Sequence, residues 1–250
     1  LNKMKTEVGL IGKGKWGSNI RSNLHKIANL KFSIGKKDNL LSEIKKNNIK
    51  WIFIATPNNT HYSIIKKCLQ KDLNVFCEKP LCLSPNKAKT LINIAKKKNL
   101  KIYVSDLYNF YNKKFKKLNS INNVYRSKFV NQKNPEFFDR LMYHDISIFY
   151  KFLRKNPLNN LIIKFDKKNK LYEIIIKLKK KQVIKFTYNL NSKKKVHIIN
   201  DLHIVSRRDL LKEMIYNVLH NKINFKENNI KSLFIIKFLN KIKKKTYYAN

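Results

Sequence analysis

A chain of 250 residues, 43% of them hydrophobic, is long enough to bury one large core or two modest ones, which excludes a disordered polypeptide. No apolar run reaches the roughly 18 residues that cross a bilayer. The apolar segment 8–11 leads into glycines rather than into a signal-peptide cleavage site. We therefore expect a cytoplasmic protein that makes no contact with a membrane.

The formal net charge of +41 comes mainly from lysine, since 6 of the 56 basic residues are arginine. Proteins that read nucleic acids favour the bidentate guanidinium of arginine. Here the lysines are spread among Asn, Ile, Phe and Tyr, which also have A/T-rich codons, so genomic base composition is the simpler cause. We expect a lysine-coated surface and no nucleic-acid partner.

Cysteine usage is equally plain. Cys68, Cys77 and Cys82 are too few for a disulfide framework, and they lack the CxxC spacing of a zinc site. We expect buried free thiols and no bound metal.

The first half of the chain alternates short apolar runs with amphipathic segments, a pattern typical of βαβ units around a parallel sheet. Strands are predicted at 7–11, 31–34, 51–54, 74–77 and 101–104. Helices are predicted between them at 15–28, 40–46, 61–71 and 85–98, the last with Ser84 as N-cap and Pro85 at its first position. We expect a doubly wound Rossmann domain over residues 1–106.

The pattern changes after residue 106. A short helical piece, a strand at 124–130 and a helix at 140–153 are followed by apolar runs at 161–165, 172–178 and 183–190. Successive strands without helices between them favour antiparallel pairing. A strand at 196–205 and helices at 208–219 and 229–241 complete the chain. We expect residues 107–250 to form a smaller α+β domain with a mostly antiparallel sheet for substrate binding and dimerisation.

A glycine loop directly follows the first predicted strand. Gly12, Gly14 and Gly17 form GxGxxG, in a chain that has five glycines in all. In such a loop the three glycines serve in turn for a tight turn, for backbone approach to a pyrophosphate, and for packing of helix on strand. The helix N-terminus receives the negative charge. We predict a dinucleotide site here, with Lys15 and Trp16 beside it.

The choice between NAD and NADP depends on the end of the second strand, where an acid would bind the ribose of NAD and basic residues the 2′-phosphate of NADP. No acid stands at the expected position near Gly35, and Lys36 and Lys37 follow. This favours NADP over NAD.

Two further motifs end the third and fourth strands, Ala55-Thr56-Pro57-Asn58-Asn59-Thr60-His61 and Glu78-Lys79-Pro80. Together with the glycine loop they resemble the ATPxxxH and EKP motifs of the Gfo/Idh/MocA oxidoreductases, over roughly residues 6–150. The resemblance implies a cis Lys-Pro bond that aims the lysine into the site. The carboxyl ends of parallel strands line the ligand crevice, so Thr56, Pro57, Asn58, His61 and Glu78 join the predicted cofactor site.

A second signature of this family is an Asp, three residues, and then a His, often continuing as HDID. His144 and Asp145 match it, but Asp139 lies five residues before His144, Arg140 holds the expected position, and Ser147 replaces the last acid. The resemblance implies catalysis by Lys79 and His144. We expect Lys79 to bind the reacting oxygen and His144 to relay the proton, with Asp139 or Asp145 holding its ring.

The resemblance further implies hydride transfer between nicotinamide and a sugar, sugar nucleotide or polyol, in a homo-oligomer formed through the C-terminal sheet. The alternative is a catalytically impaired NAD(P)-binding sensor or scaffold on the same fold. The short second domain and its irregular acid signature favour that alternative.

Overall fold

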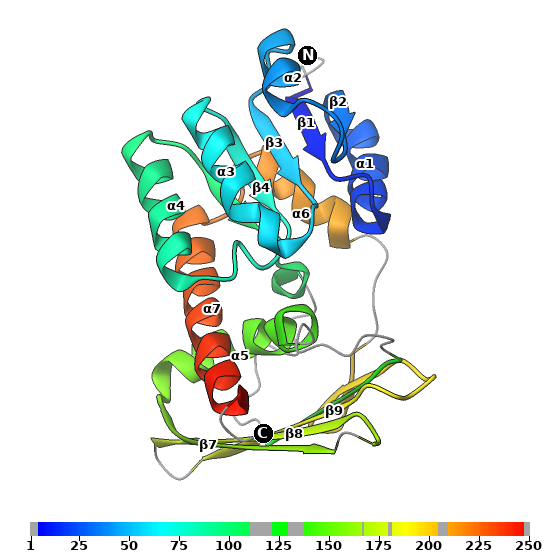
Figure 1. Cartoon of the computed structure of the whole chain (residues 1–250), viewed down its shortest axis with the longest axis vertical. Coiled ribbons are helices and arrows are strands. Elements are labelled where there is room, and N and C mark those ends of the chain that lie inside the picture. The colour runs from blue at the N-terminus through cyan, green and yellow to red at the C-terminus, as the bar shows by residue number, and fades with distance from the viewer. Residues whose placement is uncertain are drawn as a thin grey trace. The chain divides into compact units, whose positions relative to one another are not determined.

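The computed structural model describes residues 5–110, 122–129, 138–166, 168–179, 182–204 and 210–247. The chain forms two compact units (Figure 1). Leu1–Phe110 and Asp209–Lys237 make up the first unit, and Tyr111–Arg208 and Phe238–Asn250 the second. The expected division at residue 106 thus differs in one respect, because the chain returns to the first unit after residue 208.

The first unit contains a five-stranded parallel sheet. Its strands are β1 (Glu7–Ile11), β2 (Asn29–Ile34), β3 (Trp51–Ile54), β4 (Asn74–Cys77) and β5 (Ile102–Val104), in the order β2-β1-β3-β4-β5. The connecting helices are α1 (Lys15–Ile27), α2 (Leu40–Lys46), α3 (His61–Gln70) and α4 (Pro85–Lys97). The Rossmann sheet predicted from the alternating pattern is therefore confirmed. The chain winds outward in both directions from β1, which makes the gap between β1 and β3 the topological switch point where ligands bind in such sheets.

Helices cover both faces of this sheet. On one face α3 packs against α4, and on the other α1 packs against α6 (Leu210–Leu219). One core cluster joins alternate residues of the strands, such as Leu10 and Phe53, to Met214 and Ile215 of α6. This apolar stripe explains why a helix so late in the sequence belongs to the first unit.

The second unit holds a six-stranded sheet. Its strands are β6 (Asn123–Ser127), β7 (Leu158–Asp166), β8 (Leu171–Leu178), β9 (Val183–Asn189), β10 (Val196–Ile199) and β11 (Leu202–His203), in the order β11-β10-β6-β9-β8-β7. Among the described strands of this second sheet, only β6 and β9 pair in parallel, so the mostly antiparallel sheet is confirmed. A π-helical turn (Phe138–Met142) leads into α5 (Tyr143–Lys155), and α7 (Phe225–Tyr247) begins in the first unit and ends in the second.

One strand prediction in this unit is wrong. The segment expected to form a single strand at 196–205 reverses direction and forms the antiparallel pair β10–β11. The turn falls at Asn200, whose φ of 49° is a left-handed conformation that asparagine tolerates better than most residues. Val205, the expected strand end, lies outside the described residues, as does Val130 at the end of the strand expected at 124–130.

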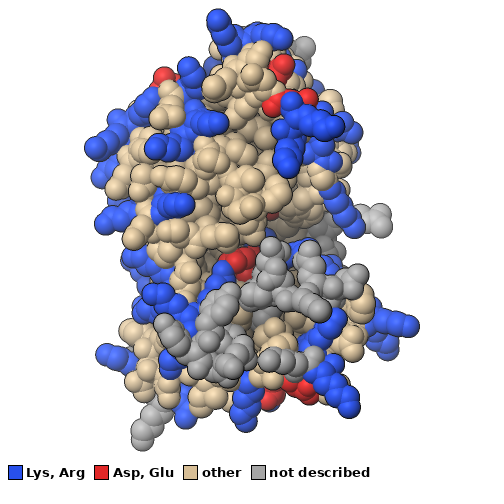
Figure 2. Space-filling view, viewed as in Figure 1, with Lys and Arg blue, Asp and Glu red and all other residues tan. Residues whose placement is uncertain are grey.

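The described surface carries many lysines. Lys and Arg side chains are scattered over the face drawn in Figure 2, and Asp and Glu side chains are few. Within the described ranges, none of the helices is both long and apolar enough to cross a membrane. All three cysteines are free and buried, as expected, and burial raises the pKa of the Cys68 thiol to about 12.

Candidate functional site

The glycine loop lies between β1 and α1, at the carboxyl edge of the parallel sheet. Gly12 has a φ of +116°, and a side chain there would overlap the carbonyl oxygen of Ala55 at the end of β3. A side chain at Gly17 would overlap the Gly12 carbonyl oxygen. The backbone thus makes close contacts at the switch point that only glycine permits.

Gly14 differs from the other two glycines of the loop. A Cβ added there would meet no atom of the described residues within 4 Å, and none of their side chains caps α1, whose N-cap is Gly14. The open space and the uncapped amides of the first helical turn form a cradle that suits a pyrophosphate. Lys15 and Trp16 follow in this turn with exposed side chains.

His61 ties the loop after β3 to the loop after β4. Its Nδ1 lies 2.8 Å from the Pro80 carbonyl oxygen, and its Nε2 lies 2.9 Å from the Thr56 carbonyl oxygen. The ring is fully buried, and this desolvation lowers its pKa although the two carbonyls act in the opposite direction. His61 therefore links the Lys79 turn to the Thr56 loop.

The Glu78-Lys79-Pro80 turn projects from the end of β4. The Lys79-Pro80 bond is cis, as the family resemblance implied, and Lys79 is half-buried. Burial raises the pKa of Glu78, while hydrogen bonds from the side chains of Trp16 and Ser105 act against this. Its Oε1 is buried and has no hydrogen-bond partner among the described residues. A buried acceptor beside the glycine loop is a feature that a bound nucleotide could satisfy.

The end of β2 holds an acid that sequence analysis did not place there. The chain turns after Gly35, and Asp38 Oδ2 accepts hydrogen bonds from the Gly35 N–H at 2.7 Å and from Lys13 Nζ at 3.0 Å. These bonds lower the pKa of Asp38. Lys36 and Lys37 are exposed in the same turn. The structure therefore places the Asp38 carboxylate against Gly35, a contact that the sequence-based preference for NADP did not take into account.

The remaining predicted residues lie in the second unit. His144 is half-buried in the first turn of α5, and Asp139 lies in the preceding π-helical turn, where it forms an ion pair with Lys243 of α7. A π turn has i→i+5 bonding. It occurs where this sequence places four residues, instead of three, between the acid and the histidine.

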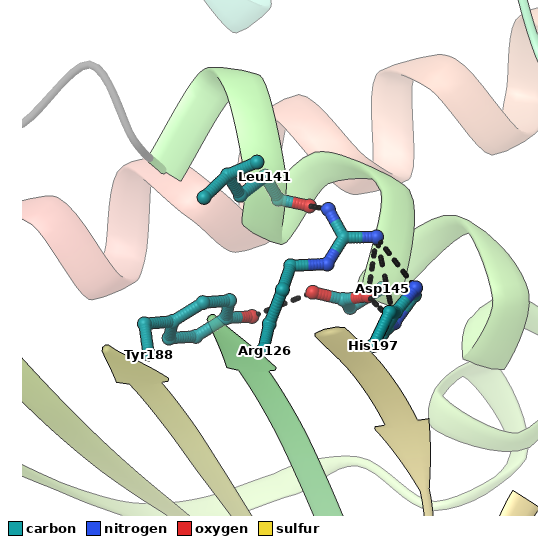
Figure 3. Close-up of polar contacts among 5 residues, drawn as sticks. All are labelled: Arg126, Leu141, Asp145, Tyr188 and His197. Carbon is teal, nitrogen blue, oxygen red and sulfur yellow. Dashed lines mark hydrogen bonds and ion pairs between the residues drawn. The ribbon is translucent and has the colours of Figure 1, made fainter. Parts of the chain in front are cut away.

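Asp145 does not hold the His144 ring. Its carboxylate is fully buried and faces Arg126, Tyr188 and His197 (Figure 3). Burial opposes its ionisation, but the Arg126 guanidinium, followed by His197 and Tyr188, keeps the pKa of Asp145 below its ordinary value. The role expected for Asp145 is thus corrected to that of a structural anion.

The structure brings together the predicted cofactor residues of the first unit at one edge of its sheet. Thr56 and Asn58 are half-buried and Pro57 is exposed in the loop after β3. Lys79 belongs to this unit, whereas Asp139, His144 and Asp145 belong to the second.

Sequence reasoning missed Asp38 and Arg126. Asp38 could have been found by allowing a turn after Gly35, but no sequence signal marked Arg126.

Comparison with known proteins agrees with this geometry. Residues 18–106 match a family described as an oxidoreductase family with an NAD-binding Rossmann fold, that of Gfo, Idh and MocA. An uncharacterized oxidoreductase of Streptococcus pneumoniae is 32% identical over 69 residues, which are 28% of this chain and 19% of that protein. The matched segment thus spans about a fifth of the relative's length.

Solved structures extend the likeness to both units. UDP-N-acetylglucosamine 3-dehydrogenase GnnA from Acidithiobacillus ferrooxidans has a TM-score of 0.77 at 12% identity, covering 96% of this chain and 97% of that one. The WlbA dehydrogenase from Thermus thermophilus, solved with NAD and UDP-GlcNAcA, has a TM-score of 0.71 at 11% identity and covers 94% of both chains. The structural likeness establishes the shared two-domain fold, and because the identities are low it establishes nothing more.

Proposed function

We propose that this chain, whose residues 18–106 match the Gfo/Idh/MocA oxidoreductase family with its NAD-binding Rossmann fold, is an NAD(P)-dependent dehydrogenase of that family. The observation that carries the proposal is the glycine loop. Gly12 and Gly17 close the backbone tightly at the switch point, and the space at Gly14 is open. A diphosphate fits this cradle, since the free amides at the start of α1 can donate to it.

We propose NAD as the preferred cofactor, in place of the NADP that the sequence favoured. Both hydrogen bonds accepted by Asp38 go to Oδ2, so among the described residues Oδ1 has no partner. A carboxylate at the end of β2 can accept a hydrogen bond from a ribose 2′-hydroxyl, whereas it repels a 2′-phosphate. If NAD is the cofactor, Lys36 and Lys37 are exposed to solvent and make no contact with a phosphate.

The protein side of the chemistry falls to two residues. The nicotinamide cofactor, when bound, supplies or accepts the hydride. Lys79 follows the strand end that lines the crevice, and its ammonium can donate to the reacting oxygen. His144 is accessible in the second unit, and an imidazole is suited to moving the proton of that oxygen near neutral pH. Asp139 lies five residues earlier, where the π turn suits it to act beside His144.

The substrate class rests on analogy. GnnA acts on a sugar nucleotide by its name, and WlbA was solved with one. We propose a sugar, sugar nucleotide or polyol that presents a carbinol or carbonyl carbon. Oligomerisation through the second sheet stays a prediction.

A second candidate is a protein that binds the cofactor without turnover. One observation favours it: the Asp139 carboxylate is paired with Lys243. An acid paired with a half-buried lysine is less free to support His144.

Titration and turnover test these proposals together. Trp16 lies at the start of α1, so NADH and NADPH binding can be followed by tryptophan fluorescence. Turnover is then followed by nicotinamide absorbance with a panel of sugar nucleotides, sugars and polyols. Lys79→Met should abolish turnover and leave NADH affinity within a few-fold, whereas the exposed control Lys66→Met should change neither. Binding without turnover on the whole panel supports the second candidate, and failure to bind either nucleotide refutes both.

A further inference from the structure

Three polar side chains form a row across the second sheet. Arg126 on β6 is in register with Tyr188 on the parallel strand β9 and with His197 on the antiparallel strand β10. Residues opposite one another on neighbouring strands project to the same face. In Figure 3 all three side chains rise from the sheet toward α5.

The row converges on Asp145. The Tyr188 hydroxyl donates to Oδ2 at 2.9 Å, His197 Nε2 lies 2.8 Å from Oδ1, and Arg126 Nη2 lies 3.3 Å from Oδ1. Arg126 Nη2 also lies 2.9 Å from His197 Nδ1. A guanidinium can only donate, so Nδ1 accepts and the ring proton sits on Nε2, facing Asp145. One cation and one anion are thus buried together with two neutral rings.

Arg126 also reaches the segment on the other side of His144. Its Nη1 donates to the Leu141 carbonyl oxygen at 3.2 Å, within the π-helical turn. The same planar group therefore contacts a backbone atom three residues before His144 and the carboxylate one residue after it. The fixed fork of a guanidinium restrains both contacts at once, which the single ammonium of lysine cannot reproduce.

We infer that Arg126 is a positioning residue, which sets His144 for proton transfer by fixing the Leu141 carbonyl and the Asp145 carboxylate on either side of it. The inference rests on the proposed function, in which His144 moves the proton. Misplacement of a catalytic group by about 1 Å can cost about 100-fold in rate. By holding the start of α5 in place, Arg126 therefore supports proton transfer by His144.

The test compares Arg126→Lys with Arg154→Lys in the full chain. Arg154 lies near the end of α5, the helix that begins beside His144, and it donates to the Tyr150 hydroxyl. The first readout is the His144 ring signal in proton–carbon NMR spectra, assigned with His144→Gln. We expect Arg126→Lys to shift this signal and its titration midpoint, and Arg154→Lys to leave both unchanged. The exposed His25 provides an internal reference.

The second readout is turnover on the substrate found above. Arg126→Lys should lower kcat by about tenfold or more with the KM for NADH within about twofold, because the cofactor loop lies in the other unit. If Arg126→Lys does not fold, Asp145→Asn, which keeps the shape of the side chain, is measured in the same way. An unmoved His144 signal in a folded variant overturns the inference, as does a KM that rises as much as kcat falls. Failure of the wild-type chain to bind NADH would refute the proposed function, while the ring signal would still decide the role of Arg126.

Discussion

Asn228 of α7 hydrogen-bonds to both backbone groups of Val104, the last residue of the edge strand β5. Its Oδ1 accepts from the Val104 N–H at 2.8 Å, and its Nδ2 donates to the Val104 carbonyl at 3.0 Å. A side-chain amide thus takes the place of a sixth strand at this point. The contact ties the late helix to the first unit, as does the ion pair between Lys231 and the buried Asp106 at 2.6 Å.

Asn228→Ala should therefore destabilise the first unit. Two backbone groups lose their partners, at a cost of about 2 kcal/mol. Chemical denaturation followed by Trp51 fluorescence measures the change, since Trp51 lies in the core of this unit. Lys226→Ala, at an exposed position in the first turn of the same helix, is the control, and an equal loss in both variants would contradict the prediction.

Gly14→Ala and Gly17→Ala should separate binding from folding. The space at Gly14 is open and its φ of −72° suits alanine, so stability should change by less than about 1 kcal/mol. The added methyl fills the cradle, so NADH affinity should fall at least about tenfold. Gly17→Ala places a methyl against the Gly12 carbonyl and should destabilise by about 1–3 kcal/mol. Thermal unfolding and fluorescence titration measure the two effects, and unchanged NADH binding by Gly14→Ala would exclude the pyrophosphate site.

Asp38→Asn should change the cofactor preference. Removal of the charge at the end of β2 relieves repulsion of a 2′-phosphate, so NADPH affinity should rise relative to NADH by about tenfold. The ratio of the two dissociation constants is the measurement, and it cancels any general loss of folded protein. Asp201→Asn, in an exposed turn of the second unit, should leave the ratio unchanged. A ratio that moves toward NADH in Asp38→Asn would reverse our assignment.

Stability should fall as the pH is lowered through the range in which histidine titrates. Burial lowers the pKa of both His61 and His197 from the ordinary value of 6.5. Below that value these histidines bind protons in the unfolded chain but not in the native state, so the free energy of unfolding decreases as the pH falls. Above that value their contribution to stability is fully present. Thermal unfolding between about pH 8 and about pH 5.5 measures the slope. His61→Gln and His197→Gln should each flatten it, and His25→Gln, at an exposed position, should not.

The local features of the fold could be predicted from the sequence. Strands β1, β3 and β4 begin and end at the predicted residues, because a short apolar run bounded by polar turns is a local pattern. The glycine loop could be predicted for the same reason, since its conformational demands fall on the glycines themselves. The Lys79 turn follows from a motif of three consecutive residues.

The contacts of the second unit required tertiary structure. The row Tyr188–Arg126–His197 joins residues 62 and 71 positions from Arg126, and its register depends on which strands become neighbours. The parallel β6–β9 pair and the reversal at Asn200 have no local signature that separates them from a plain antiparallel run. Asp38 lies only 3 residues from Gly35, yet its place depended on the turn between them. Periodicity fixes which residues are buried, whereas the partner of a buried charge is set by the packing of distant segments, so the sequence by itself determined the cofactor fold and tertiary structure decided what surrounds His144.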